Sequence, residues 1–202
     1  MEPFKSHQGL VAVINRANVD TDQIIPKQFL KRIERTGFGQ FLFFDWRFDD
    51  QGNDRPEFEL NQPENKGASI LVAGRNFGSG SSREHAVWAL ADFGFRCVIA
   101  ESYSDIFYNN CFKNGVLPIV LDSDTIHQLM DRKQNQADFQ LNVDLASQTI
   151  VGDDGLKIEF EIDPVMKQPL LEGLDDIGQT MKQEEKITAY ELAHKMAPVS
   201  QP

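Results

Sequence analysis

Short apolar runs alternate with helix-patterned segments through the middle of the chain. Runs that are apolar almost throughout are typical of strands buried on both faces of a parallel sheet. Three of them predict strands: Ala68–Ala73, Cys97–Ala100 and Val116–Leu121. Helices are predicted after these runs, from the apolar spacing and from the glycines that end two of them: Arg83–Gly94, Ser104–Asn114 and Asp122–Lys133. The alternation predicts an α/β fold with a parallel strand–helix core.

The flanking segments add elements of other kinds. An N-terminal strand is expected at Gly9–Ile14, a short basic helix at Lys27–Arg35 and an irregular excursion at Asp45–Lys66. A more hairpin-like set of strands is expected near the other end, at Phe139–Val143, Thr149–Val151 and Lys157–Ile162. A helix is expected at Glu184–Met196, with frayed residues after it. The pattern holds no internal repeat and no linker, so we expect one compact domain over residues 1–202.

Composition and charge narrow the functional classes. The chain is 41% hydrophobic and 25% charged, as in ordinary globular proteins, and its formal net charge is −11. That charge disfavours nucleic acid and anionic membranes as partners. The sequence has no apolar run long enough to span a membrane and no recognisable signal peptide, and Cys97 and Cys111 are its only cysteines. We therefore expect a cytoplasmic protein with reduced thiols.

The stretch Gly74–His85, GRNFGSGSSREH, carries the candidate chemistry. Its three closely spaced glycines, between a strand and a helix, allow backbone N–H groups and the positive end of the helix dipole to converge on an anion. Ser82 and Arg83 add a hydroxyl donor and a guanidinium that can bind a carboxylate through two hydrogen bonds. A structural alternative is a capping box, with Ser81 as the N-cap and Glu84 bonding back to it. The residues alone leave both interpretations open.

Familiar motifs do not fit this loop. The lysine of a phosphate-binding P-loop is missing, and the third glycine of a dinucleotide fingerprint is replaced. Glu84 stands where a nucleophile elbow around Ser82 requires glycine. The four histidines are scattered and the two cysteines are too few for an iron–sulfur cluster, so no metal site is predicted in this chain.

Two motifs in a fixed order carry a family resemblance. NVDTDQIIP (Asn18–Pro26) and GRNFGSGSSREHA (Gly74–Ala86) resemble the small-subunit family of the 3-isopropylmalate dehydratases. More distantly they are similar to the C-terminal swivelling domain of aconitase. The likeness extends over most of the chain, including Phe29–Gly39 and Ser104–Ile119. It implies a swivelling β/β/α fold.

The resemblance implies a hydro-lyase of leucine biosynthesis that interconverts 2-isopropylmalate and 3-isopropylmalate through an alkene. It implies a [4Fe–4S] cluster on a separate large subunit, no cofactor on this chain, and a small dicarboxylate as substrate. Ser81 would be the base that removes the carbon-bound proton, and Asp22 would lie near it. Ser82, Arg83 and Arg32 would hold substrate carboxylates.

Other interpretations of these residues stay open. Asp20 and Asp22 could simply form a turn, and the basic run with Lys31 and Arg32 could be a solvated helix face. Leu30 and Ile33 in that run could line the pocket for the isopropyl group or pack in the core. The chain could also serve a related hydro-lyase for homoaconitate or methyl-substituted malate, or be a non-catalytic carboxylate-binding module. Cys97, Cys111 and Trp88 are expected in the core.

Overall fold

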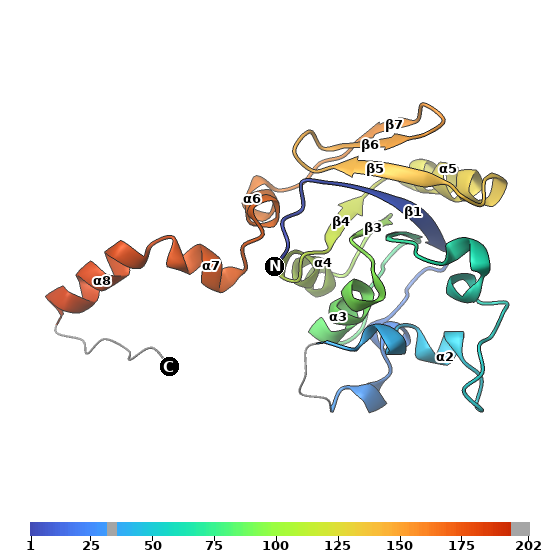
Figure 1. Ribbon diagram of the computed structural model, residues 1–202, viewed down its shortest axis with the longest axis horizontal. Coiled ribbons are helices and arrows are strands. Elements are labelled where there is room, and N and C mark those ends of the chain that lie inside the picture. The colour runs from blue at the N-terminus through green and yellow to red at the C-terminus, as the bar shows by residue number, and fades with distance from the viewer. Residues whose placement is uncertain (32–35, 195–202) are drawn as a thin grey trace.

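A single mixed sheet organises the computed structural model, which describes residues 1–31 and 36–194 (Figure 1). Within these residues the strand order is β4-β3-β2-β1-β5-β6-β7, with β1 to β4 parallel and β5 to β7 antiparallel to their neighbours. The strands are β1 (Ser6–Ile14), β2 (Ile70–Ala73), β3 (Cys97–Ala100), β4 (Leu117–Val120), β5 (Gln140–Asp144), β6 (Thr149–Gly152) and β7 (Lys157–Glu159). The predicted parallel core and the added hairpin region are confirmed.

Helices connect the parallel strands and continue past the sheet. The connecting helices are α1 (Thr21–Ile24), α2 (Phe44–Arg47), α3 (Glu84–Phe93), α4 (Asp105–Lys113) and α5 (Ser123–Asn135). Beyond the sheet come α6 (Pro164–Glu172), α7 (Asp176–Met181) and α8 (Glu184–Ala193). Short 3-10 turns lie at Lys27–Phe29, Gly39–Phe41, Glu59–Asn61 and Pro63–Asn65. Helix α8 confirms the predicted C-terminal helix from Glu184 to Ala193, and residues 195–196 of the predicted range lie outside the described part.

Side chains of β2 alternate between two apolar clusters, one on each face of the sheet. Leu71 and Ala73 pack with α1, α3 and the aromatic residues of the excursion, whereas Ile70 and Val72 pack with α5 and with Leu170 of α6. All four β2 residues are fully buried. Cover on both faces explains why the strands are continuous apolar runs without polar alternation.

The long segment between β1 and β2, which includes the predicted excursion, is held by aromatic packing in its described residues. Phe43 stacks on Trp46 at a ring-centroid distance of 5.4 Å, and Phe29 stacks on Phe41 at 4.0 Å. The Phe38 amide also donates to the Asp92 carboxylate of α3 at 2.8 Å. The segment is irregular in backbone but closely packed.

Two predictions about helices need correction. Lys27–Arg35 was expected to be a basic helix, but only a 3-10 turn forms at Lys27–Phe29, and residues 32–35 lie outside the described part. The stacking of Phe29 on Phe41 ties this turn to the aromatic cluster, so tertiary packing overrides local helix propensity. Helices α6 and α7 were not predicted, although Asp163-Pro164 is a good N-cap and first-turn pair for α6.

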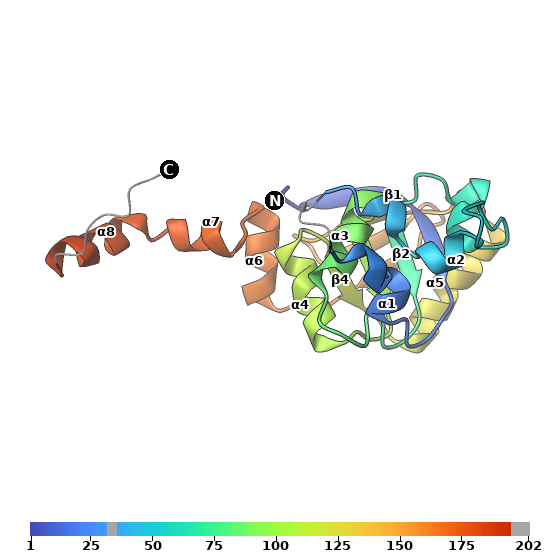
Figure 2. The same ribbon diagram turned by 90° about the horizontal axis from the view of Figure 1, so that it is seen from below.

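The C-terminal helices leave the body of the molecule as an arm (Figures 1 and 2). Helix α6 is anchored, because Leu170 is buried and its carbonyl accepts a hydrogen bond from the Phe4 amide at 2.9 Å. Helices α7 and α8 then project away from the sheet. In the part of the chain that the structure describes, no helix is long and apolar enough to cross a membrane.

Candidate active site

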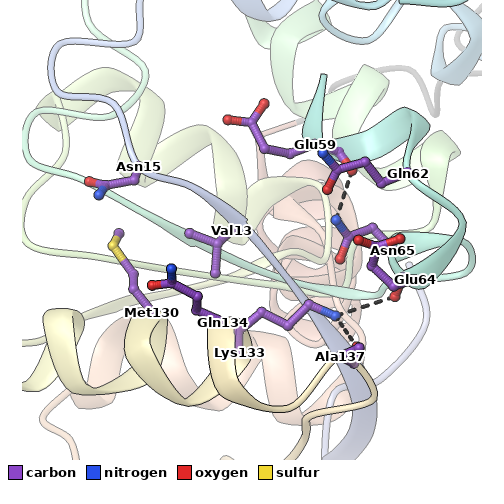
Figure 3. A pocket seen from close by; sticks show the side chains of 10 residues that line it. All are labelled: Val13, Asn15, Glu59, Gln62, Glu64, Asn65, Met130, Lys133, Gln134 and Ala137. Carbon is purple, nitrogen blue, oxygen red and sulfur yellow. Dashed lines mark hydrogen bonds between the residues drawn. The ribbon is translucent and has the colours of Figure 1, made fainter. Parts of the chain in front are cut away.

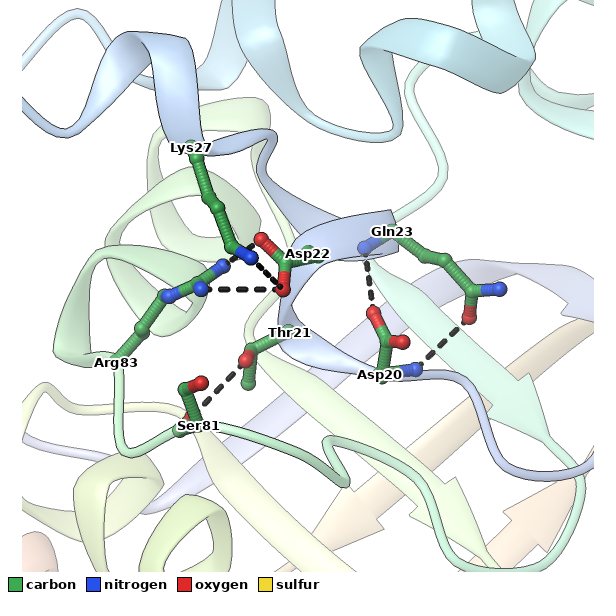
Figure 4. Close-up of polar contacts among 7 residues, drawn as sticks. All are labelled: Asp20, Thr21, Asp22, Gln23, Lys27, Ser81 and Arg83. Atoms are coloured by element: carbon green, nitrogen blue, oxygen red, sulfur yellow. Dashed lines mark hydrogen bonds and ion pairs between the residues drawn. The ribbon is translucent and has the colours of Figure 1, made fainter.

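Backbone hydrogen bonds join the two motifs at the carboxyl ends of β1 and β2. Asp20 and Ser79 form a parallel bridge, and the Thr21 amide donates to the Ser79 carbonyl at 2.9 Å. The Thr21 hydroxyl donates to the carbonyl of Ser81 at 2.9 Å (Figure 4). Segments about sixty residues apart therefore form one surface, at the edge of the sheet where α/β proteins bind ligands.

Gly78 fixes the path of the glycine loop. Its φ is +71°, and a Cβ atom there would lie 2.1 Å from the ring of Phe107, so neither the backbone nor the space admits a side chain. The Ser104 hydroxyl donates to the Gly78 carbonyl at 2.5 Å. Helix α4 and its N-cap residue therefore fix the loop at Gly78, whereas Ser81 and Ser82 are exposed to solvent.

The start of α1 is satisfied by its own side chains. The Asp20 carboxylate accepts from the Gln23 amide at 2.8 Å, while the Gln23 side chain accepts from the Asp20 amide at 2.9 Å (Figure 4). This is a capping box. This capping box was not predicted, although an aspartate followed three residues later by glutamine is its signature. Asp20 therefore has a structural role.

The start of α3 is built differently, and of the two interpretations left open by the sequence, the structure excludes the capping box. Arg83 occupies the N-cap position without a capping side-chain hydrogen bond, and Glu84 accepts instead from the Asn114 side chain at 3.0 Å. Ser81 and Ser82 are exposed, and among residues 1–31 and 36–194 their hydroxyls have no hydrogen-bond partner. The amides of Ser81, Ser82 and Arg83 have no backbone acceptor in that part of the chain either. Several donors therefore remain open at the positive end of the helix.

An ion-pair cluster lies beside these open donors. Both terminal nitrogens of Arg83 donate to the Asp22 carboxylate, the longer contact being 3.1 Å, and Lys27 Nζ is 3.5 Å from the same carboxylate (Figure 4). The Arg83 side chain is only 10% exposed, whereas that of Asp22 is 38% exposed. The hydrogen bond from Arg83 lowers the pKa of Asp22, so this carboxylate stays ionised at neutral pH.

The structure brings together four of the five predicted site residues. Ser81 and Ser82 directly precede Arg83 at the start of α3, and Asp22 is paired with Arg83, while Arg32 lies outside the described residues. The Asp22 carboxylate binds Arg83 and not the Ser81 hydroxyl. Among the described residues, the Asp22 carboxylate therefore accepts two of the five N–H donors of Arg83.

Two residues of this arrangement, Lys27 and Thr21, were not predicted as part of the site. Lys27 was considered only as part of a basic helix, yet it lies at the first position after Pro26 and reaches Asp22. Thr21 is buried and links α1 to the backbone of Ser81. Nothing in the local pattern marks a threonine for a long-range contact of this kind.

The donor set does not fit an iron–sulfur cluster. Cys97 and Cys111 are fully buried, and burial raises the pKa of each thiol, which disfavours the thiolate that a cluster needs. Among the described residues no group of three or more His, Cys, Asp or Glu side chains could hold a metal ion. A cluster would therefore have to be held outside these residues.

A cleft of about 540 Å³ lies between the excursion and α5, and it contains none of the predicted site residues (Figure 3). Its buried lysine, Lys133, donates to the backbone carbonyls of Glu64 and Ala137. These bonds tie the excursion to α5, so Lys133 has a sufficient structural explanation. The open donors and the ion-pair cluster, rather than cleft size, mark the start of α3 as the candidate site.

Profiles of known protein families match most of the chain. The profile of the aconitase C-terminal domain matches residues 1–124, which defines the class: an aconitase-type C-terminal domain. The LeuD_N profile matches residues 127–164. The profile of the C-terminal domain of the 3-isopropylmalate dehydratase small subunit matches residues 176–197.

Similar proteins extend the match over almost the whole chain. The 3-isopropylmalate dehydratase small subunit of Rhodopirellula baltica is 61% identical over 194 residues, covering 96% of this chain and 99% of the relative. The small subunit from Bacillus subtilis is 59% identical over 191 residues, covering 95% and 96%. The crystal structure of 3-isopropylmalate dehydratase (leuD) from Methanocaldococcus jannaschii matches with a TM-score of 0.66 at 27% identity, over 92% of this chain and 99% of that one. The chain belongs to the 3-isopropylmalate dehydratase small-subunit family, which confirms the resemblance.

Proposed function

We propose that this chain supplies the carboxylate-binding and proton-transfer half of a 3-isopropylmalate dehydratase site. The observation that carries the proposal is the uncapped start of α3, where two exposed serine hydroxyls and open amides lie beside Arg83. A substrate carboxylate can accept hydrogen bonds from Ser82, from the amides and from Arg83. Asp22 then acts as a positioning residue that holds the guanidinium in place.

Ser81 is the proposed base. In the forward direction it takes a proton from C3 of 2-isopropylmalate, the hydroxyl on C2 leaves as water with a second proton, and 2-isopropylmaleate forms. Returning a proton to C2 while water adds its hydroxyl to C3 gives 3-isopropylmalate. A serine alkoxide is accessible only where donors and positive charge stabilise it. The amides at the start of α3, its dipole and Arg83 provide this field.

The proposed site is shared with a separate large subunit. The family resemblance implies that this partner carries a [4Fe–4S] cluster, which would activate the substrate hydroxyl. This agrees with the buried, protonated thiols here, which do not suit cluster binding. The exposed side chains of Ser81 and Ser82 need cover, because proton transfer to an alkoxide requires that bulk water be excluded.

Reconstitution tests the proposal. Isomerisation of 2-isopropylmalate is measured with this chain alone, with a cluster-loaded large subunit alone, and with both. We expect turnover only in the mixture. Isomerase activity of this chain by itself would contradict the shared site. An inactive mixture, together with tight binding of 2-isopropylmalate by the isolated chain, would favour the carboxylate-binding module instead.

A further inference from the structure

The arm formed by α7 and α8 exposes large apolar side chains. Ile177 is 72% exposed and Leu192 is 74% exposed, and three more apolar residues of these helices are also exposed: Met181, Ile187 and Tyr190. Single exposed apolar residues are common on protein surfaces. A concentration of them on two consecutive helices that leave the body points to an interaction surface.

The helices of the arm are too short to be stable without packing. Helix α7 has six residues and α8 has ten, and isolated helices of fewer than about 12–15 residues are marginal in water. Helices in proteins gain most of their stability by packing an apolar face against another element. A surface that covers the apolar residues of the arm would provide that packing.

The arm begins next to the candidate active site. A cleft of about 280 Å³ is lined by Glu84 and Asn114 on one side and by Asp175, Asp176 and Ile177 on the other. Glu84 directly follows Arg83 in α3. The first turn of α7 is also tied to α4, because Lys113 Nζ is 3.3 Å from the Asp176 carboxylate. A protein that covers Ser81 and Arg83 would therefore reach the base of the arm without a break in the surface.

The family profiles divide the chain in an informative way. Residues 1–124 match the profile of the aconitase C-terminal domain. The name of that profile indicates a domain at the end of a longer chain. The profile named for the C-terminal domain of the small subunit covers residues 176–197, which include α7 and α8. The arm thus matches a segment specific to the separate small subunit. In such an enzyme, contacts must replace the covalent link between the two halves.

We propose that the arm, residues 175–194, is a docking element for the large subunit and extends the interface that closes the active site. The proposal rests on the proposed function for the identity of the partner. The arm's apolar residues bury themselves on the large subunit, and the helices are stabilised when they do so. A second copy of this chain is the competing occupant, but self-association would not account for the position of the arm beside the active-site face.

The test measures affinity for the large subunit separately from catalysis. The double variant Ile177→Ser/Leu192→Ser removes two exposed apolar anchors from the full chain and leaves the sheet and site residues in place. Its Kd for the large subunit is compared with that of Val151→Ser, which changes an exposed apolar residue on β6, outside the arm. We expect the double variant to raise the Kd by at least about 10-fold, because truncating buried anchors at interfaces has effects of this size. The control should leave the Kd unchanged.

Activity measured over a range of concentrations of the large subunit gives the second readout. The double variant should need more of this partner for half-maximal activity and should regain the wild-type kcat at saturation. An unchanged Kd, or loss of a homodimer with no change in Kd, would overturn the docking proposal. If the wild-type complex proves inactive, the proposed function fails, but the comparison of Kd values still decides the role of the arm.

Discussion

Two helices meet at the candidate site, and their first turns are satisfied in different ways. At the start of α1, Asp20 and Gln23 bond to each other's backbone and form a capping box. At the start of α3, the N-cap residue is Arg83, no side chain caps the helix, and Glu84 is bound to Asn114 instead. One helix start is closed by its own residues, while the other keeps its donors available.

Other helices of the chain help to interpret this difference. Aspartates cap the starts of α5, α6 and α7, so the sequence uses this device repeatedly. At the start of α4 the Ser104 side chain makes no cap, because its hydroxyl supports the glycine loop at Gly78. The starts of α2 and α8 also lack a side-chain cap, so what distinguishes the start of α3 is its surroundings. At α3 those surroundings are two exposed hydroxyls and a guanidinium, which together suit an anionic ligand.

The open start of α3 would bind the carboxylate of any malate homologue, so discrimination needs an apolar surface elsewhere. Leu30, half-buried next to the aromatic cluster, is the described candidate, whereas Ile33 lies outside the described residues. We expect Leu30→Ser to lower kcat/KM for 2-isopropylmalate by about 10–200-fold, and much less for a smaller 2-alkylmalate. Leu156→Ser, in the other apolar cluster, is the control. Equal losses for both substrates with a lower Tm would assign Leu30 to packing alone.

Replacing Arg83 tests whether its guanidinium binds a substrate carboxylate at the start of α3. Arg83→Lys should raise KM about 10–100-fold with a smaller change in kcat, because lysine cannot donate two parallel hydrogen bonds. Asp22→Asn should raise KM by less, since it frees Arg83 without removing it. Arg16→Lys, at an ion pair with Glu59 outside the site, is the control. An unchanged KM for Arg83→Lys would rule out its carboxylate role.

An added carboxylate could close the start of α3 artificially. Ser82→Asp places an anion beside the open amides, so we expect a gain of about 0.3–1 kcal/mol in the free energy of unfolding. The same change should weaken substrate binding, because the new carboxylate competes for the same donors. Ser82→Asn provides the uncharged control for thermal melting and for KM. Tighter substrate binding by the aspartate variant would contradict an anion site at this position.

Removing a cap from α1 should have the smallest effect. Asp20→Ala and Asp122→Ala each delete an aspartate that accepts a helix-start amide, one in α1 and one in α5. Each should lower the free energy of unfolding by about 1 kcal/mol. Only Asp20→Ala should also reduce activity, because α1 contains Asp22, whose carboxylate binds Arg83. Equal activities for the two variants would show that the α1 cap does not contribute to the candidate site.

The parts of the fold that the sequence predicts well are those with strong local signals. Fully apolar strands such as Cys97–Ala100 and the helix stop at Gly94 were located from pattern alone. The 3-10 turn at Lys27–Phe29 was not, because the stacking of Phe29 on Phe41 depends on a residue twelve positions away. Helix α7 was missed although Asp175 caps it, since Gly178 interrupts its pattern.

In the candidate site, too, some features could be predicted from local sequence and others depend on the tertiary structure. The glycine loop is recognisable because Gly78 is required by its φ and by the nearby ring of Phe107. The resemblance placed Asp22 near Ser81, but the residues alone could not show that its carboxylate binds Arg83. Such pairings depend on how β1 and β2 align in the sheet. The Ser81–Glu84 spacing left a cap possible, and the structure excludes it because Arg83 is the N-cap and Glu84 binds Asn114.

The measurement that bears most directly on the open start of α3 is the kcat of Ser81→Ala with a saturating, cluster-loaded large subunit. Ser123→Ala, at an exposed position in the first turn of α5, is the matched control. We predict that Ser81→Ala lowers kcat by about 100-fold or more. Its free energy of unfolding should stay within about 0.5 kcal/mol of wild type, because the hydroxyl caps no helix. Retained kcat with a loss of about 1 kcal/mol would instead make Ser81 a structural cap and contradict the proposed site.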